Sequence, residues 1–189
     1  MPAKRNVMPY RGVKKVSGWG CSFDSLTELK YAMSIMENYY FLRSPVSIYY
    51  HPGTKITLDK IRRCHLRYTP DFLVRNKQTF EAHLVEIKPR VFQNHPQLDL
   101  RKAVAENYIA RKNLDWKYKV VFDDEIILDE QQLLDFECAA SLNTVAEVTQ
   151  WFNEYCHRMG YVFPDNLLTD LIITGRLTQN PKWKQMRLL

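Results

Sequence analysis

The sequence predicts an α/β core followed by a small helical appendage. Two apolar, partly β-branched stretches, residues 68–74 and 84–89, are each closed by turn-forming residues and are typical of short strands. Apolar residues at helical spacing come before and after this pair of strands. From Asp129 onward the pattern is helical. We therefore expect strands and helices to share one core, with helices alone in the C-terminal part.

The two predicted strands bring polar side chains to one face of a sheet. Residues 75–79 between them are polar and favour a hairpin-like connection. Because side chains alternate along a strand, Glu86 and Lys88 share one face. Asp71, at the start of the neighbouring strand, lies where it can meet them. Two acids and a lysine are costly to bury together, and a divalent metal ion is one interaction that would offset this cost.

The N-terminal half carries a helix and further strand signals. Apolar residues at helical spacing predict a helix over residues 22–40. Ser25 and Glu28 fit a capping box, in which the glutamate bonds back to the N-cap amide, so helix chemistry alone favours a capping role for Glu28. A strand is predicted over residues 46–50, whereas residues 56–66 favour no single element.

The downstream half alternates helix and strand before it becomes helical. The periodicity predicts a helix over residues 98–113, a strand over 116–122 and a further short strand over 126–128. The acidic run at residues 123–125 resembles a metal site, but a solvated strand end is the simpler interpretation. Asn143-Thr144 offers a helix cap. The helices expected in the appendage span residues 131–140, 144–159 and 166–174.

The net charge favours a polyanionic partner. The chain of 189 residues has a formal net charge of +6. Lys14 and Lys15 lie in a basic N-terminal arm suited to phosphate contacts, and a solvated terminus is the alternative. Arg62, Arg63 and Arg67 lead directly into the strand of Asp71, as a phosphodiester substrate would require, although a solvated strand face would look the same.

Cysteine usage and hydropathy bear on the compartment. The four cysteines include no C-x-x-C pair, and the chain is too large to look like a disulfide scaffold. Adjacent Cys-His pairs do not have the usual spacing of zinc ligands, so reduced thiols are expected. No apolar run has the length of a membrane span, and the N-terminus has no signal-peptide core. A cytoplasmic protein is therefore expected.

Four sequence blocks in order carry a resemblance to a known family. They are Phe23-x-Ser25-x-x-Glu28, Tyr68-Thr69-Pro70-Asp71-Phe72-Leu73, Val85-Glu86-Ile87-Lys88-Pro89 and the stretch 116–126. In this order the sequence resembles the PD-(D/E)xK nuclease superfamily, whose restriction-endonuclease-like core is a mixed sheet flanked by helices. Within the superfamily the sequence is most similar to TnsA, the endonuclease subunit of heteromeric transposases. It departs from that family at Phe122, where a small polar residue is expected, and in a short tail that is not clearly winged-helix.

The resemblance implies a set of catalytic residues. Asp71 would be the bridging metal ligand, Glu86 and the carbonyl of Ile87 would hold one ion, and Glu28 would hold the other or its water. Lys88 would orient or help deprotonate the attacking water. Carboxylate ligands suit Mg²⁺ or Mn²⁺, and two ions are expected. Residues 1–128 would form the nuclease core with its basic arm, and residues 129–189 the helical appendage.

The resemblance also implies a reaction and partners. The reaction would be hydrolysis of one strand of double-stranded DNA at a transposon end. The family acts with a DDE transposase (TnsB-like) and an AAA+ regulator (TnsC-like), so this chain would contact mainly phosphates. Two alternatives stay open: a stand-alone nuclease of phage, restriction or junction-resolving type, and a catalytically silent DNA-binding or assembly module.

Overall fold

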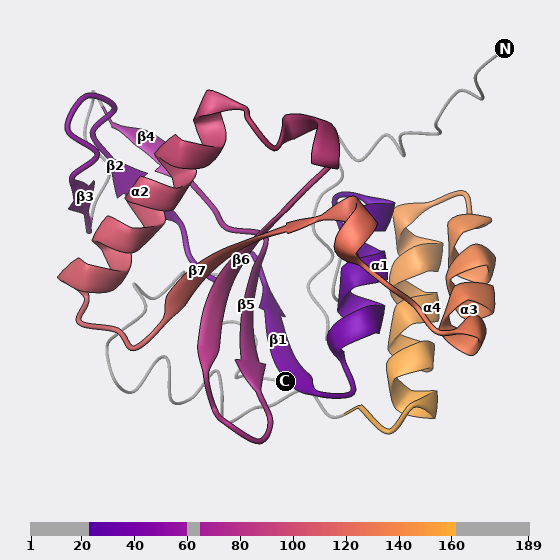
Figure 1. The fold of residues 1–189 in the computed structure, drawn as a ribbon. Helices are drawn as coiled ribbons and strands as arrows, with labels where there is room; N and C mark the ends of the chain where they lie inside the picture. Colours follow the sequence, from indigo (N-terminus) through magenta and orange to yellow (C-terminus); the bar gives the residue numbers. More distant parts are fainter. Residues whose placement is uncertain (1–22, 60–64, 162–189) are drawn as a thin grey trace, which may run out of the picture. The chain divides into compact units, whose positions relative to one another are not determined.

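The chain folds into two compact units, shown in Figure 1. The computed structural model describes residues 23–59 and 65–161. Among these, residues 36–59 and 65–125 form a unit that contains both sheets, and residues 23–35 and 126–161 form a helical unit. The predicted division after residue 128 stays a prediction. Within the described residues, no helix has the length and apolar character needed to cross a membrane.

The main sheet is mixed, as expected for the predicted α/β class. Its strand order is β1-β5-β6-β7, with bounds Tyr39–Arg43, Phe72–Asn76, Ala82–Lys88 and Lys117–Phe122. The pairs β1/β5 and β5/β6 are antiparallel, whereas β6/β7 is parallel. Helix α2, Pro96–Arg111, makes the crossover that a parallel pair requires. The class predicted from the sequence is confirmed.

The connection between β5 and β6 is a hairpin, as predicted. The side-chain oxygen of Asn76 accepts hydrogen bonds from the amides of Gln78 (2.8 Å) and Thr79 (2.9 Å). An asparagine that bonds amides two and three residues ahead stabilises a turn locally. The register pairs Phe72 with Val85, which puts the start of β5 beside the end of β6.

A second, three-stranded sheet has the order β3-β2-β4. Its strands are β2, Ile48–Tyr50, β3, Thr57–Leu58, and β4, Leu66–Tyr68, all paired antiparallel. The strand predicted over residues 46–50 corresponds to β2. The undecided stretch 56–66 contains β3, and its residues 60–64 lie outside the described part of the chain.

The single strand predicted over residues 68–74 is wrong. Tyr68 ends β4 in the small sheet, and Phe72 begins β5 in the main sheet. Pro70 lies between them and has no N–H to give to a strand ladder, so pairing stops there and the chain passes from one sheet to the other. This switch allows Tyr68 and Asp71 to approach the end of β6 from two different sheets.

The helix predicted over residues 22–40 is too long at its C-terminal end. Helix α1 spans Leu26–Ile35, and residues 39–43 form β1, which pairs with β5. The aromatic and aliphatic residues of β1 fit a pleated, half-buried surface. Lys77 donates hydrogen bonds to the carbonyls of Met36 (2.9 Å) and Glu37 (2.8 Å) just before this strand begins.

The helical unit contains α1, α3 (Glu130–Ala140) and α4 (Val145–Arg158). The predicted cap at Thr144 is confirmed, because its hydroxyl accepts from the amide of Glu147 (3.2 Å) while that carboxylate accepts from the amide of Thr144 (2.8 Å). The strand predicted over 126–128 is wrong, since these residues form no regular element. The helix predicted over 166–174 lies outside the described residues.

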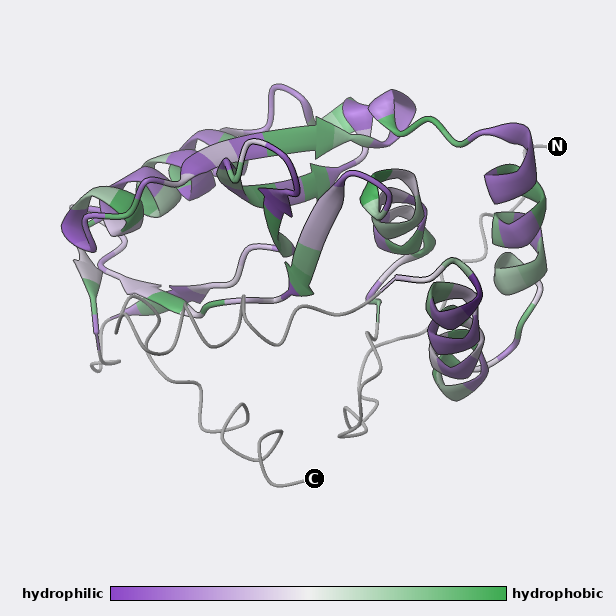
Figure 2. Cartoon of the chain, turned by 90° about the horizontal axis from the view of Figure 1, so that it is seen from below, coloured by the Kyte–Doolittle hydropathy of each residue, from purple (hydrophilic) through white to green (hydrophobic). Residues whose placement is uncertain are grey.

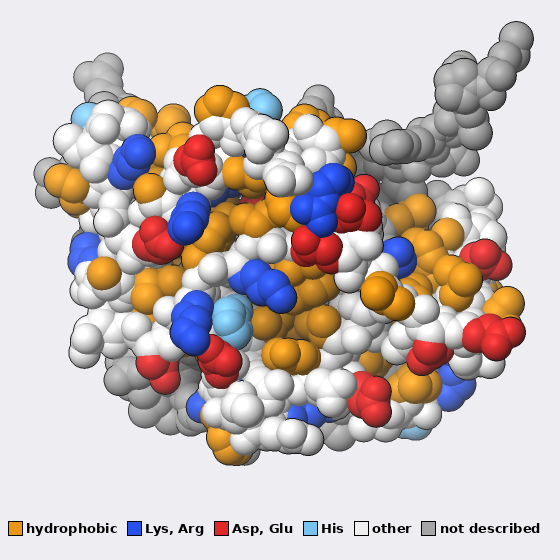
Figure 3. All heavy atoms as spheres, viewed as in Figure 1, with side chains coloured by type: hydrophobic (Ala, Val, Ile, Leu, Met, Phe, Trp, Pro, Cys, Tyr) orange, Lys and Arg blue, Asp and Glu red, His pale blue; other side chains and the backbone are white. Residues whose placement is uncertain are grey.

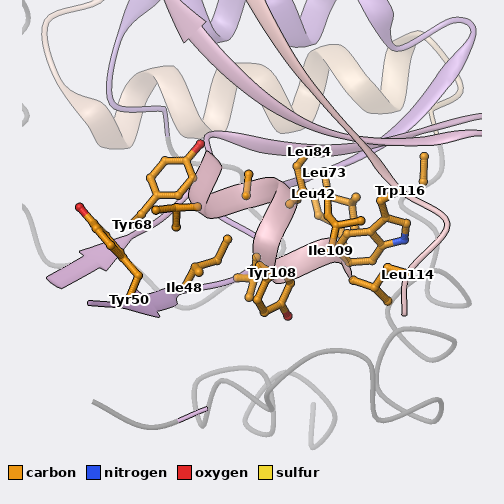
Figure 4. Close-up of a cluster of buried hydrophobic side chains, with 14 residues drawn as sticks. Leu42, Ile48, Tyr50, Tyr68, Leu73, Leu84, Tyr108, Ile109, Leu114 and Trp116 are labelled. Carbon is orange, nitrogen blue, oxygen red and sulfur yellow. The ribbon is translucent and has the colours of Figure 1, made fainter. Parts of the chain in front are cut away.

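One apolar cluster joins α2 to both sheets (Figure 4). Tyr108 and Ile109 of α2 pack with Leu84 of the main sheet and with Ile48 of the small sheet. Figure 2 shows hydrophobic and hydrophilic residues alternating along the helices, as expected where one helix face is buried. The cluster fixes the small sheet and α2 against the main sheet, and both elements contribute side chains to the site described next.

Candidate active site

The end of β6 and the start of β5 bring Asp71, Glu86 and Lys88 together. Lys88 Nζ lies 2.6 Å from Glu86 Oε1 and 3.9 Å from Asp71 Oδ2. Asp71 Oδ2 also accepts a hydrogen bond from the backbone N–H of Ile87 at 2.7 Å. The convergence expected from strand alternation is present, because Glu86 and Lys88 lie on one face of β6 and Asp71 just precedes the neighbouring strand.

The ammonium of Lys88 lies among oxygen atoms that the resemblance to nucleases implies as metal ligands. It donates to the carbonyl oxygen of Ile87 at 2.9 Å, in addition to its contacts with the carboxylates of Glu86 and Asp71. Two carboxylates and a backbone carbonyl make a set of hard oxygen donors, which suits Mg²⁺ or Mn²⁺. The ammonium of Lys88 occupies the position among them.

Glu86 is the most deeply buried acid of this group. Its exposed fraction is 1%, and both of its carboxylate oxygens have partners. Tyr68 donates its hydroxyl hydrogen to Oε2 at 2.8 Å. Arg101, on α2, forms an ion pair with Oε1, the same oxygen that Lys88 contacts. A buried carboxylate is stable only with such partners.

Tyr68 and Arg101 were not predicted as site residues. They come from β4 and α2, which the sequence separates from Glu86 by 18 and 15 positions. Tyr68 lies two residues before Pro70-Asp71, and this nearness to the motif is the one feature of the sequence that could have indicated Tyr68 as a site residue. Arg101 lies outside the apolar stripe of its helix in the sequence, as most exposed arginines do, so nothing distinguishes it there.

Burial and charge set the protonation of the site. Burial, followed by the negative charge of Glu86, raises the pKa of Asp71 to about 6, while Lys88 opposes this rise. Burial also raises the pKa of Tyr68, and the charge of Glu86 adds to the effect. Tyr118, whose hydroxyl lies 3.4 Å from that of Tyr68, has a pKa raised mainly by burial. Both tyrosines are therefore neutral near pH 7, and Tyr68 keeps the hydrogen that it donates.

Glu28 adopts a capping arrangement at the start of α1. Ser25 Oγ accepts from the amide of Glu28 at 3.2 Å, and Glu28 Oε2 accepts from the amide of Asp24 at 3.0 Å. The bond goes to the residue before Ser25 rather than to the amide of Ser25 itself. Glu28 is 8% exposed and belongs to the helical unit, so its role as a metal ligand stays a prediction.

The basic residues predicted to contact DNA are only partly described. Arg67 is exposed on β4, and strand alternation puts it on the opposite face from Tyr68. Lys14, Lys15, Arg62 and Arg63 lie outside the described residues. On the face seen in Figure 3, basic and acidic side chains are interspersed over the sheet-containing unit.

The acidic run at residues 123–125 anchors the turn that follows Lys88. The backbone N–H of Arg90 donates to Asp123 Oδ1 at 2.8 Å. The guanidinium of Arg90 pairs with Asp124 at 2.8 Å and with Glu125 at 2.7 Å. Asp124 and Glu125 are thus exposed, as predicted for a solvated strand end, but paired. Among the described residues, no group of three or more His, Cys, Asp or Glu side chains is placed to hold a metal ion.

A mixed sheet that carries Asp71 beside Glu86-x-Lys88 is consistent with the PD-(D/E)xK class of nucleases. Residues 33–121 match the family described as "TnsA-like endonuclease N terminal". This segment is therefore similar to TnsA-like endonucleases, as its motifs predicted. The match includes Asp71, Glu86 and Lys88, whereas Glu28 precedes it. No curated protein and no solved structure matches the chain significantly.

Proposed function

We propose that this chain is a metal-dependent DNA endonuclease that hydrolyses one strand at transposon ends, as the TnsA-like subunit of a heteromeric transposase. One observation carries the proposal. Within the segment that matches the family, the ammonium of Lys88 lies among oxygen atoms of Asp71, Glu86 and Ile87. Two carboxylates can hold a metal ion near a phosphate, and an amine beside them can orient the attacking water.

The metal ligands would be Asp71, Glu86 and the carbonyl of Ile87, with Glu28 holding a second ion or its water. Mg²⁺ or Mn²⁺ bound there would stabilise charge on the attacking and leaving oxygens of the phosphate. The donor set supports this choice, because it contains oxygen atoms and no thiolate.

The protein groups each have a proposed task. The amide of Ile87 fixes the orientation of the Asp71 carboxylate, and Tyr68 fixes that of Glu86. Lys88 would orient the attacking water, help to remove its proton and offset the charge that develops on the phosphate. Positions held by backbone and buried side-chain hydrogen bonds need little rearrangement during the reaction.

The substrate would be double-stranded DNA, held through its phosphates. Arg67 would contribute to this contact, together with the basic residues outside the described part of the chain, Lys14, Lys15, Arg62 and Arg63. Sequence recognition would be the task of the DDE transposase (TnsB-like), regulated by an AAA+ protein (TnsC-like). Similarity to TnsA-like endonucleases supports this assignment of partners.

A cleavage assay with and without the transposase tests the proposal. The purified chain is incubated with Mg²⁺ and a labelled transposon-end duplex, alone and with a TnsB-like transposase. We expect a single-strand cut at the end only when the transposase is present. Cutting of arbitrary duplexes by the chain alone would identify a stand-alone nuclease. If neither reaction cuts DNA, the chain is a silent binding module.

A further inference from the structure

The cation-binding oxygen of Glu86 is already shared by two basic side chains. Lys88 and Arg101 both contact Oε1, and Tyr68 occupies Oε2. Glu86 is 1% exposed, so solvent does not compete for either oxygen. Each carboxylate oxygen has about two acceptor positions, and both of those on Oε1 are taken. A metal ion that binds Glu86 through Oε1 must therefore displace Lys88 or Arg101.

The charges of the cluster sum to zero without a metal ion. Asp71 and Glu86 contribute two negative charges when ionised, and Lys88 and Arg101 contribute two positive charges. A divalent cation that enters this cluster meets two nearby positive groups in a partly buried site, where charges interact several times more strongly than in water. The cluster as it stands is therefore a poor site for a cation.

Arg101 is the partner best placed to leave. Tyr68 is buried in the apolar cluster that joins the sheets, and Lys88 also contacts the Ile87 carbonyl and lies near Asp71. The side chain of Arg101 extends from a different element, α2, and is 31% exposed. A guanidinium released from Glu86 binds a phosphate through paired N–H groups and is less strongly hydrated than an ammonium.

We propose that Arg101 neutralises Glu86 in the absence of substrate and transfers to a DNA phosphate when the duplex arrives, so that metal ion and DNA bind cooperatively. This inference rests on the proposed nuclease function. The arriving phosphate supplies negative charge to the site at the same time as it removes a competing cation from Glu86. By linkage, DNA must then tighten metal binding by the same factor as the metal tightens DNA binding.

The affinity for a metal ion in the absence of DNA tests whether Arg101 competes with the ion for Glu86. Mn²⁺ is titrated calorimetrically into the full chain without DNA, for the wild type and three variants. We expect Arg101→Gln to bind Mn²⁺ at least about tenfold more tightly than the wild type, because one competing charge is gone. Arg101→Lys keeps the charge and is expected to match the wild type. Lys102→Gln removes a neighbouring charge that pairs with Glu106 instead, and it is expected to match the wild type as well.

The same titration with DNA present tests whether DNA and the metal ion bind cooperatively. With a duplex whose linkages are phosphorothioates, the affinity of the wild type for Mn²⁺ is expected to rise at least about tenfold, and the affinity of Arg101→Gln is expected to rise less.

Two results without DNA overturn the inference. One is an equal Mn²⁺ affinity of Arg101→Gln and the wild type. The other is a gain in Mn²⁺ affinity in Lys102→Gln as large as the gain in Arg101→Gln. If circular dichroism shows Arg101→Gln to be unfolded, the test uses the Mn²⁺ affinity of the wild type with and without DNA. Equal affinities under the two conditions overturn the inference. If no variant binds Mn²⁺ even with DNA, the proposed nuclease function fails as well.

Discussion

Tyr68 donates its hydroxyl hydrogen to Glu86 over 2.8 Å, although the two residues lie in different sheets. The bond satisfies one oxygen of a carboxylate that is 1% exposed. The small sheet thus acts as a support for the site, because it delivers a buried donor that the strands around Glu86 do not supply.

Tyr68→Phe removes the donor and leaves a buried carboxylate oxygen without its partner. We expect the free energy of unfolding to fall by roughly 1.5–3 kcal/mol, the range for a lost hydrogen bond to a charged group. Urea denaturation measures this change. Tyr118→Phe is the matched control, since the bond from Tyr68 to Glu86 survives in that variant, and it is expected to lose less stability. Equal losses in the two variants would mean that the hydrogen bond to Glu86 does not contribute more to the free energy of unfolding than the contacts of the Tyr118 hydroxyl.

Asp71→Ala and Lys88→Ala are expected to abolish strand cleavage while the fold is retained. Loss of a positioned acid–base group lowers the rate by roughly 10²–10⁴-fold, and loss of a metal ligand lowers it further. The assay is single-strand cutting of a labelled transposon-end duplex in the presence of the transposase, with circular dichroism as the test of folding. Lys119→Ala, an exposed lysine on β7, is the control and is expected to cut normally. Unchanged cutting by both site variants would discard the site.

Asp71→Asn is expected to stabilise the metal-free protein at neutral pH. The pKa of Asp71 is about 6 in the folded protein against an ordinary value of 3.8, so the folded state binds a proton more tightly than the unfolded state between these values. Wild-type stability therefore falls as the pH rises from about 4 to about 6 and then levels off. The difference of about two pH units corresponds to roughly 3 kcal/mol as an upper figure.

Thermal unfolding in the presence of a chelator, from pH 4 to pH 8, measures the effect. The advantage of Asp71→Asn is expected to be small at pH 4, to grow up to about pH 6 and to stay constant above it. A constant difference over the whole range would show that the carboxyl of Asp71 titrates at an ordinary pH in the fold.

Glu28 is predicted to be a metal ligand although its carboxylate is seen in a capping bond. Glu28→Gln keeps an oxygen that can accept from the amide of Asp24 but removes the charge. We expect cleavage to be lost in this variant with little change in stability. Ser25→Ala removes the other capping bond, and we expect it to lose about 1 kcal/mol of stability while cleavage is retained. Normal cleavage by Glu28→Gln would leave Glu28 with the capping role alone.

Local signals in the sequence specified several elements correctly. The cap at Thr144 was predictable because a capping box is made by residues three positions apart. The hairpin between β5 and β6 was predictable because its polar turn separates two apolar strands. Strand alternation was enough to put Glu86 and Lys88 on one face. In each case, the interacting residues are close in the chain.

The errors arose where distant residues decide the structure. Residues 39–40 continue a helical apolar pattern, yet they pair with β5 because an extended partner strand is available there. Residues 68–74 look like one strand, but Pro70 ends the first ladder and the two halves join different sheets. Periodicity reports which face is apolar and gives no information about which sheet an extended segment joins.

The order of the motifs indicated the family that residues 33–121 match, and the apolar patterns predicted the α/β class. Strand geometry fixes neighbours two residues apart, so the sequence also predicted the pair Glu86 and Lys88. The tertiary structure alone decided that Tyr68 and Arg101 hold Glu86. These contacts join β4, β6 and α2, and they form because the burial of apolar side chains brings these elements together. A buried carboxylate must then take its partners from whatever elements surround it.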